Sequence, residues 1–278
     1  MIVAVQGKAA YAYTGGKALD PALPAVVFVH GAEHDHSVWA LQSRYFANHG
    51  FNVLAVDLPG HCRSEGPAKT TVEALADWLG DLLDAVGAPA ALVIGHSMGS
   101  LVALDFASRH PSRTLGIALV ATAVPMAVSD ALLDAALNRE PEAIELVNGW
   151  SHSTIAAKPS SPGPGFWLHG VNQRLMERVS ARGEPNLFHT DFAACNNYAH
   201  GLERAARVRC PVRLVLGAKD MMTPPRATRA LVDTLEAAGA PVDVITLQAG
   251  HALMSEQPDA TLDALFAFAR SAVASETA

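Results

Sequence analysis

The stretch Ala90–Pro111, AALVIGHSMGSLVALDFASRHP, contains a strand pattern, a turn pattern and a helix pattern in immediate succession. The run Ala90–Gly95 is apolar throughout, which is typical of a strand covered on both faces of a parallel sheet. Met98–His110 has helical spacing and ends before Pro111, which cannot continue a helix. The pentapeptide Gly95-His96-Ser97-Met98-Gly99 predicts a sharp turn, in which two positions without side chains leave the serine hydroxyl exposed above the sheet.

Similar apolar runs alternate with helical patterns on both sides of this stretch. The expected strands are 25–30, 51–57, 90–95, 115–123, 211–217 and 242–247, and the expected helices are 37–49, 71–86, 98–110, 225–238 and 258–273. Because strands that alternate with helices form a parallel sheet with helices on both faces, the predicted fold class is α/β with a mostly parallel central sheet. The first residues, Ile2–Val5 and Lys8–Tyr13, are expected to form a hairpin at the edge of the sheet.

The alternation stops between residues 125 and 206, where no strand pattern occurs. Helical pieces are expected there at 129–139, 141–147, 166–181 and 190–208, around a loop rich in proline and glycine at 158–165. The simplest interpretation is one α/β core domain, formed by residues 1–124 and 207–278, that is interrupted by a helical cap insertion, residues 125–206.

Composition excludes several classes of protein. The chain of 278 residues is 50% hydrophobic and 17% charged, so it is not a disordered chain, and its net charge of −7 comes without a basic stripe that would bind nucleic acid. The cysteines Cys62, Cys195 and Cys210 lack the spacing of a disulfide framework or a zinc site. No apolar run is long enough to span a membrane, and the N-terminal residues lack the pattern of a secretory signal. We therefore expect a cytoplasmic protein that binds neither nucleic acid nor a membrane.

Two further polar residues follow the ends of predicted strands. Asp220 comes after the run 211–217, and His251 comes after the run 242–247. In a parallel sheet, functional groups gather on the loops that follow the carboxyl ends of the strands. A serine hydroxyl is a weak nucleophile unless a histidine removes its proton and an acid orients that histidine. We therefore predict that Ser97, Asp220 and His251 are the nucleophile, the acid and the base, in the chain order found in Ser-Asp-His hydrolases.

These motifs resemble the α/β-hydrolase family, and the resemblance extends over both halves of the chain. The segment His30-Gly31-Ala32 resembles the family's oxyanion loop, which implies that the backbone N–H groups of Ala32 and Met98 form the oxyanion hole. The segment Asp57–Ser64, DLPGHCRS, is similar to the family's D-x-P-G-x-G-x-S loop, except that Cys62 replaces the second glycine. The resemblance implies a serine-nucleophile, esterase-like member with a helical cap and no cofactor.

The nucleophile and the oxyanion loop narrow the expected reaction. Haloalkane dehalogenases and epoxide hydrolases have an aspartate where this chain has Ser97, and the segment His30–His34 differs from proline iminopeptidase and lipase patterns. The preferred function is hydrolysis of a small carboxylic ester, thioester or lactone through an acyl-enzyme. Two alternatives remain open. One is a carbon–carbon bond hydrolase with the same triad, which His96 and Ala252 disfavour, and the other is a receptor that binds a small ligand without turnover.

Substrate specificity is expected to depend on a pocket between the cap and Ser97. The candidate pocket residues come from the oxyanion loop, the cap and the loop after Asp220, and they are His30, Glu33, His34, Trp150, Trp167 and Met222. This mixture predicts a small-molecule substrate that is partly apolar. The segment Glu33–His36 has residue types that bind metals, but adjacent side chains seldom face one ion. We therefore expect no metal there and interpret the segment as a solvated loop at the mouth of the pocket.

Overall fold

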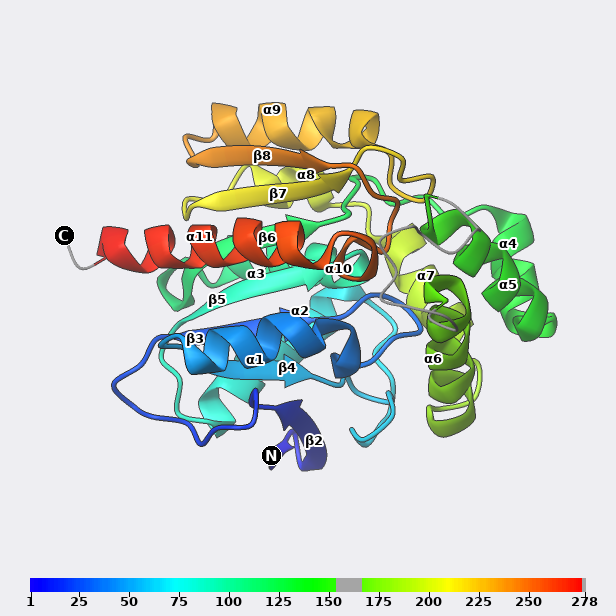
Figure 1. Ribbon diagram of the computed structural model, residues 1–278, viewed down its shortest axis with the longest axis horizontal. Helices are drawn as coiled ribbons and strands as arrows, with labels where there is room; N and C mark the ends of the chain where they lie inside the picture. The colour runs from blue at the N-terminus through cyan, green and yellow to red at the C-terminus, as the bar shows by residue number, and fades with distance from the viewer. Residues whose placement is uncertain (154–166, 277–278) are drawn as a thin grey trace.

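The structure, a computed structural model, describes residues 1–153 and 167–276 (Figure 1). The loop expected at 158–165 and the first residue of the helix expected at 166–181 lie outside the described residues. The described residues form an eight-stranded sheet in the order β1-β2-β4-β3-β5-β6-β7-β8. The strands β1 and β2 pair antiparallel with each other and β2 pairs antiparallel with β4, whereas the other neighbours are parallel. The predicted α/β class is confirmed.

The strands lie close to their expected positions. Their bounds are β1 Ile2–Val5, β2 Lys8–Tyr13, β3 Ala25–Val29, β4 Asn52–Val56, β5 Ala91–His96, β6 Thr114–Val120, β7 Val212–Gly217 and β8 Val242–Leu247. The expected edge hairpin is confirmed as β1 and β2. The strand β6 ends earlier than expected, because Ala121 has a φ of +51° and leaves the extended conformation.

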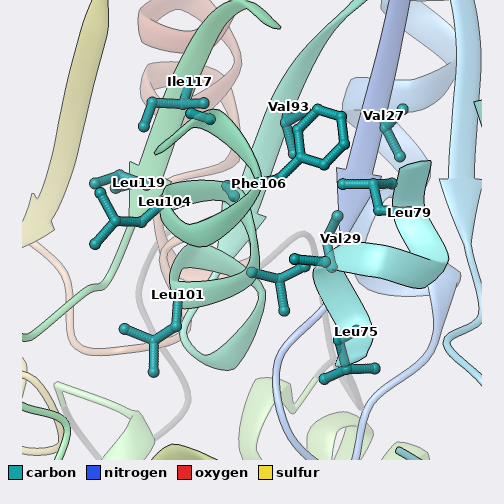
Figure 2. Packing of buried hydrophobic residues seen from close by; sticks show 14 of the residues in the cluster. Val27, Val29, Leu75, Leu79, Val93, Leu101, Leu104, Phe106, Ile117 and Leu119 are labelled. Atoms are coloured by element: carbon teal, nitrogen blue, oxygen red, sulfur yellow. The ribbon is translucent and has the colours of Figure 1, made fainter. Parts of the chain in front are cut away.

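Helices cover both faces of the sheet. Those of the core are α1 Ala40–Asn48, α2 Val72–Ala85, α3 Met98–Arg109, α9 Arg229–Ala237, α10 Leu253–Glu256 and α11 Pro258–Glu276, with short 3₁₀ turns at His36–Trp39, Pro111–Arg113 and Pro225–Thr228. Figure 2 shows Val27 and Val93 of the strands packed with Leu79 of α2 and Phe106 of α3. The alternate side chains of the same strands, such as Phe28, pack toward α1 and α11 in a second cluster. Burial on both faces explains why these strands are apolar throughout.

The helices that follow β6 lie together beyond the carboxyl ends of the parallel strands (Figure 1). Their bounds are α4 Asp130–Asn138, α5 Glu140–Ser151, α6 Leu168–Arg182 and α7 Leu187–Asn197. They share a small core of their own, which includes Leu132, Ile144, Met176 and Phe188. The prediction of one helix at 190–208 is wrong in one respect. The chain forms two helices there, α7 and α8 (Gly201–Ala205), which are separated near Tyr198. The Tyr198 hydroxyl lies 3.1 Å from Asp105 Oδ1 of α3, a contact that anchors the break.

Two observations concern the chain as a whole. Cys62, Cys195 and Cys210 are free thiols. Among the helices of the described residues, none combines the length and the apolar character that crossing a bilayer requires.

Candidate active site

Ser97 lies in the turn that connects β5 to α3. Its backbone has a φ of +51° and a ψ of −118°, a strained conformation for a residue other than glycine. The flanking glycines make the turn possible: a Cβ atom on Gly95 would lie 2.0 Å from Gly99 O, and one on Gly99 would lie 2.4 Å from Val29 O. The Ser97 N–H donates to Val120 O at 2.9 Å and ties the turn to the neighbouring strand. The serine therefore occupies a rigid position at the N-terminus of α3.

Asp220 and His251 follow β7 and β8 and meet above the sheet. His251 Nδ1 lies 2.9 Å from Asp220 Oδ2, and Asp220 also accepts the backbone N–H groups of Met222 and Thr223, each at 2.8 Å. Burial alone would raise the pKa of Asp220, but the His251 ring and these hydrogen bonds hold it well below its usual range. An ionised carboxylate only accepts hydrogen bonds, so His251 Nδ1 carries the proton and Nε2 is left free to accept one.

Thr223 supports this pair and was not identified from the sequence. Its hydroxyl donates to Asp220 Oδ2 at 2.7 Å and lies 3.2 Å from His251 Nδ1. The residue sits in the short loop after β7, and threonine is common in such loops, so the sequence carried no specific signal for it. The hydroxyl fixes the orientation of the carboxylate that in turn orients the imidazole.

His96 connects the serine turn to the histidine loop. Its side chain is 3% exposed, and burial holds the pKa of its imidazole well below the usual value, so the ring is neutral. Nε2 lies 2.9 Å from His251 O, and because a carbonyl only accepts, His96 donates this hydrogen bond. The residue that precedes the serine therefore positions the loop that carries His251.

The loop after β3 lies directly against the serine turn. A Cβ atom on Gly31 would lie 3.1 Å from the Cβ of Ser97, so only glycine fits without a shift of its neighbours. The next N–H group, that of Ala32, donates to no other group in the described part of the chain, and the same is true of Met98 N–H. Met98 begins α3, where a helix leaves its first N–H groups free. Two backbone donors are thus available on this side of Ser97.

The next residues of this loop are buried, so the expectation of a solvated loop is wrong. Glu33 and Asp35 are 0% and 2% exposed. Neither carboxyl oxygen of Glu33 has a hydrogen-bond partner among the described residues, and its backbone has a φ of +53°. Burial, with a contribution from the Asp191 carboxylate, raises the pKa of Glu33 to about 9. Glu33 is therefore a neutral carboxylic acid at neutral pH.

The histidines of this loop use their ring nitrogens for structure. His30 Nδ1 lies 2.8 Å from Gly31 O, and its Nε2 accepts the N–H of Leu58 at 3.1 Å. His34 Nδ1 lies 2.7 Å from Ala32 O, and its Nε2 lies 3.1 Å from an amide oxygen of helix α6. Both rings shape the backbone around the site.

A cavity of about 160 Å³ contains Ser97 and His251. It is lined mainly by apolar side chains: Met126, Val128, Leu132, Trp150, Phe192, Met221 and Met222. Of the predicted pocket residues, Trp150 and Met222 line this cavity, whereas His30, Glu33 and His34 are not among its lining residues. Trp167, which is 47% exposed, lines a separate groove of about 710 Å³ beside α1 and α6.

The residues of this loop that could bind a metal take part in hydrogen bonds and in one ion pair. Ligand-type atoms of Asp35, His36 and Asp57 lie within 4.8 Å of one another. His36 Nδ1 lies 2.6 Å from Asp57 Oδ1, and the Arg178 guanidinium donates to Asp35 Oδ2 at 2.7 Å. Ser37 N–H also donates to Asp35 Oδ1 at 2.8 Å, so carboxylate oxygens of both Asp35 and Asp57 take part in hydrogen bonds within the protein.

Comparison with known proteins places the chain in a family. The model of the alpha/beta hydrolase family matches residues 26–264. The pimeloyl-(acyl-carrier protein) methyl ester esterase of Chromobacterium violaceum is 30% identical over 233 residues, which cover 76% of this chain and 82% of that protein. Epoxide hydrolase B of Mycobacterium tuberculosis is 36% identical over 107 residues, or 37% of this chain and 30% of that protein. Among solved structures, the enol-lactonase from Burkholderia xenovorans LB400 has a TM-score of 0.80 at 22% identity, covering 96% of this chain and 99% of that one. The chain therefore belongs to the α/β-hydrolase family.

Proposed function

We propose that the protein is a serine hydrolase that cleaves a small, uncharged carboxylic ester through an acyl-enzyme intermediate. One observation carries the proposal: Ser97 shares a cavity with His251, whose Nδ1 is held 2.9 Å from the buried Asp220. The names of two similar proteins, an ester esterase and an enol-lactonase, favour an ester or lactone bond over other bonds. Ser97 also distinguishes the chain from enzymes of the family that attack through an aspartate.

In the proposed mechanism, His251 Nε2 removes the proton of Ser97 as the serine oxygen attacks the ester carbonyl. Asp220 stabilises the imidazolium that forms. The N–H groups of Ala32 and Met98 donate to the oxyanion, and each such donor is typically worth about 3–4 kcal/mol in the transition state. His251 then gives its proton to the departing alcohol. A water molecule, activated by the same base, releases the carboxylic acid and restores Ser97.

The cavity supports a substrate with a short apolar group. Its volume of about 160 Å³ is below the range of ~300–1,000 Å³ that is usual for drug-sized ligands. The described residues that line it include no aspartate, glutamate, lysine or arginine. A charged group buried there would find no carboxylate, ammonium or guanidinium group of opposite charge in the lining, so we propose an uncharged ester.

The inserted helices supply much of this cavity, which supports their role as a cap. Leu132 comes from α4, Trp150 from α5 and Phe192 from α7. We therefore propose that residues 125–206 form the cap and that 1–124 and 207–278 form the core. In this arrangement the core carries the reacting groups, and the cap sets the size of the substrate.

A series of p-nitrophenyl esters, from acetate to longer acyl chains, tests the proposal when combined with a fluorophosphonate probe. We expect multiple turnover that is fastest with short chains, and we expect Ser97→Ala to lower kcat by at least about 10⁴-fold and to abolish labelling. Ser112→Ala, at an exposed serine, is the matched control and should keep both the turnover of esters and the labelling by the probe. Labelling of Ser97→Ala at the full rate would refute the assignment. A single slow burst of the wild type without further turnover would indicate a receptor instead.

A further inference from the structure

Three consecutive residues of the loop after β3 contact the inserted helices α6 and α7. We call residues 30–35 the oxyanion loop, because they include the proposed donor Ala32. The contacts are Glu33 N–H to Asp191 Oδ2 at 3.0 Å, His34 Nε2 to Asn172 Oδ1 at 3.1 Å, and Arg178 to Asp35 Oδ2 at 2.7 Å. A loop of the core is therefore held by side chains that lie more than a hundred positions later in the sequence.

The peptide unit between Ala32 and Glu33 is fixed at both of its ends. Its carbonyl oxygen lies 2.7 Å from His34 Nδ1, and its N–H donates to Asp191 at 3.0 Å. The Ala32 Cα joins this unit to the preceding Gly31–Ala32 peptide, which carries the Ala32 N–H, so a displacement of the fixed unit would shift that N–H as well. The φ of +53° at Glu33 is unfavourable for a non-glycine residue and persists only where surrounding contacts hold it.

The environment of Asp191 favours its hydrogen bond with the Glu33 N–H. The side chain is buried, 2% exposed, and its Oδ2 accepts both the Glu33 N–H and His61 Nε2, the latter at 2.9 Å. Burial lowers the pKa of His61, but the Asp191 carboxylate more than offsets this effect, so the pKa of His61 is raised. The neighbouring carboxyl group of Glu33 stays protonated and adds no second negative charge. The position of the Asp191 carboxylate is thus fixed by a buried hydrogen bond with the His61 ring.

We propose that Asp191 is a positioning residue for the oxyanion hole, holding the Ala32–Glu33 peptide so that the Ala32 N–H points at the reacting oxygen. This inference rests on the proposed function. The inserted helices would then do more than enclose the substrate: α7 completes the site that stabilises the transition state.

The expected change in kcat follows from the contribution of one oxyanion-hole donor to stabilising the transition state. Complete loss of one donor costs about 10²–10³-fold in kcat, and a donor that is loosened but present costs less. We expect Asp191→Ala to lower kcat by roughly 10–100-fold and to leave KM within about 3-fold, because the geometry matters in the transition state rather than in the bound ester.

The experiment separates this role from general stability. Because Asp191→Ala leaves His61 without this hydrogen-bond partner, we also use Asp191→Ala combined with His61→Gln, which removes the buried imidazole. The matched controls are His61→Gln alone, which keeps the acceptor for Glu33, and Asn197→Ala, at an exposed position on the same helix. Asp191→Asn keeps an oxygen that can accept the Glu33 N–H and should retain kcat within about 5-fold.

The outcomes are distinct. A loss of kcat in both Asp191→Ala variants, with recovery in Asp191→Asn, supports the proposal, whereas unchanged kcat or a change in KM alone overturns it. Amide hydrogen exchange of residues 31–36 gives a readout that does not depend on turnover. We expect faster exchange at Glu33 in the folded Asp191→Ala variants, and unchanged exchange overturns the proposal. If the wild type fails to turn over esters, the proposed function fails, and the exchange measurement still decides whether Asp191 holds the loop.

Discussion

The two sides of Ser97 are built in different ways. On the base side, Asp220 and His251 follow neighbouring strands, and the carboxylate receives its hydrogen bonds from Met222 and Thr223 of its own loop. On the oxyanion side, the loop after β3 depends on side chains of α6 and α7. The carboxylate that orients the base is thus held by groups of the core, although the histidine loop also contacts the insertion, where the Ala252 N–H donates to Ser151 O of α5 at 2.9 Å. The loop after β3, by contrast, is held by side chains of the insertion.

The two buried carboxyl groups of the site, those of Asp220 and Glu33, differ in their hydrogen-bond partners. Asp220 is surrounded by donors, and the pKa of its carboxyl is held below the usual range. Glu33 has no hydrogen-bond partner for its carboxyl group among the described residues, and its pKa is raised to about 9. Burial alone raises the pKa of both, so the donors around each group decide whether it is charged.

The largest expected effect tests the base side. Asp220→Asn should lower kcat by roughly 10³–10⁴-fold, because a neutral amide neither stabilises the imidazolium nor holds the correct tautomer of His251. Steady-state kinetics with the preferred ester measures the change. Asp233→Asn, at an exposed aspartate of α9, is the matched control and should change kcat little. A loss smaller than about tenfold would contradict the assignment of Asp220 as the acid.

A smaller effect, on stability, tests the other carboxyl group. Folded Glu33 keeps its proton up to about pH 9, whereas in the unfolded chain it ionises near ~4.3. The folded state therefore binds more protons in this window, and its free energy of unfolding falls as the pH rises toward about 9. Glu33→Gln removes this dependence and should gain a few kcal/mol relative to the wild type at the alkaline end, since each pKa unit corresponds to about 1.4 kcal/mol.

Urea unfolding across this pH range measures the difference. Glu145→Gln, at an exposed position on α5, serves as the control and should follow the wild-type curve. If the Glu33→Gln and wild-type curves stay parallel from acid to alkaline pH, Glu33 is not a buried neutral acid.

The smallest expected effect refines the description of the base side. Thr223→Val removes the hydroxyl that donates to Asp220 Oδ2, while the backbone donors and His251 remain. We expect kcat to fall by roughly 3–10-fold, in line with the loss of about 1–1.5 kcal/mol for one hydrogen bond. Thr223→Ser keeps the hydroxyl and should recover the activity. A loss as large as that of Asp220→Asn would mean that Thr223 orients the imidazole directly.

Local rules were sufficient to predict the sheet and the position of the three polar loops. Buried parallel strands must be apolar throughout, so runs such as Ala91–His96 are visible in the sequence. Ser97, Asp220 and His251 follow strand ends, and the carboxyl ends of parallel strands meet at one edge. Their proximity therefore depends on the topology, which the alternation of strands and helices already indicates.

Long-range contacts decided the features that were not predicted. The helix expected to end at 147 continues to Ser151, although Asn148 and Gly149 disfavour helices. The Asn148 amide donates to His169 O of α6 at 2.9 Å, which compensates for burying it. Glu33 was expected in a solvated loop because its neighbours are polar, but its side chain is buried and its backbone N–H donates to Asp191 of α7. No pattern within a short window of sequence contains this information.

The contacts between the oxyanion loop and helices α6 and α7 have a consequence for the exchange of segments between related proteins. A chimera that receives residues 125–206 from a relative with a different substrate would also lose Asp191, Asn172 and Arg178 as partners of the loop. Such a chimera would gain a new substrate specificity, but its oxyanion loop would be held less firmly. Exchange of the insertion should succeed best when residues 33–35 are transferred with it, so that the two segments behave as one unit of recombination although they are far apart in the chain.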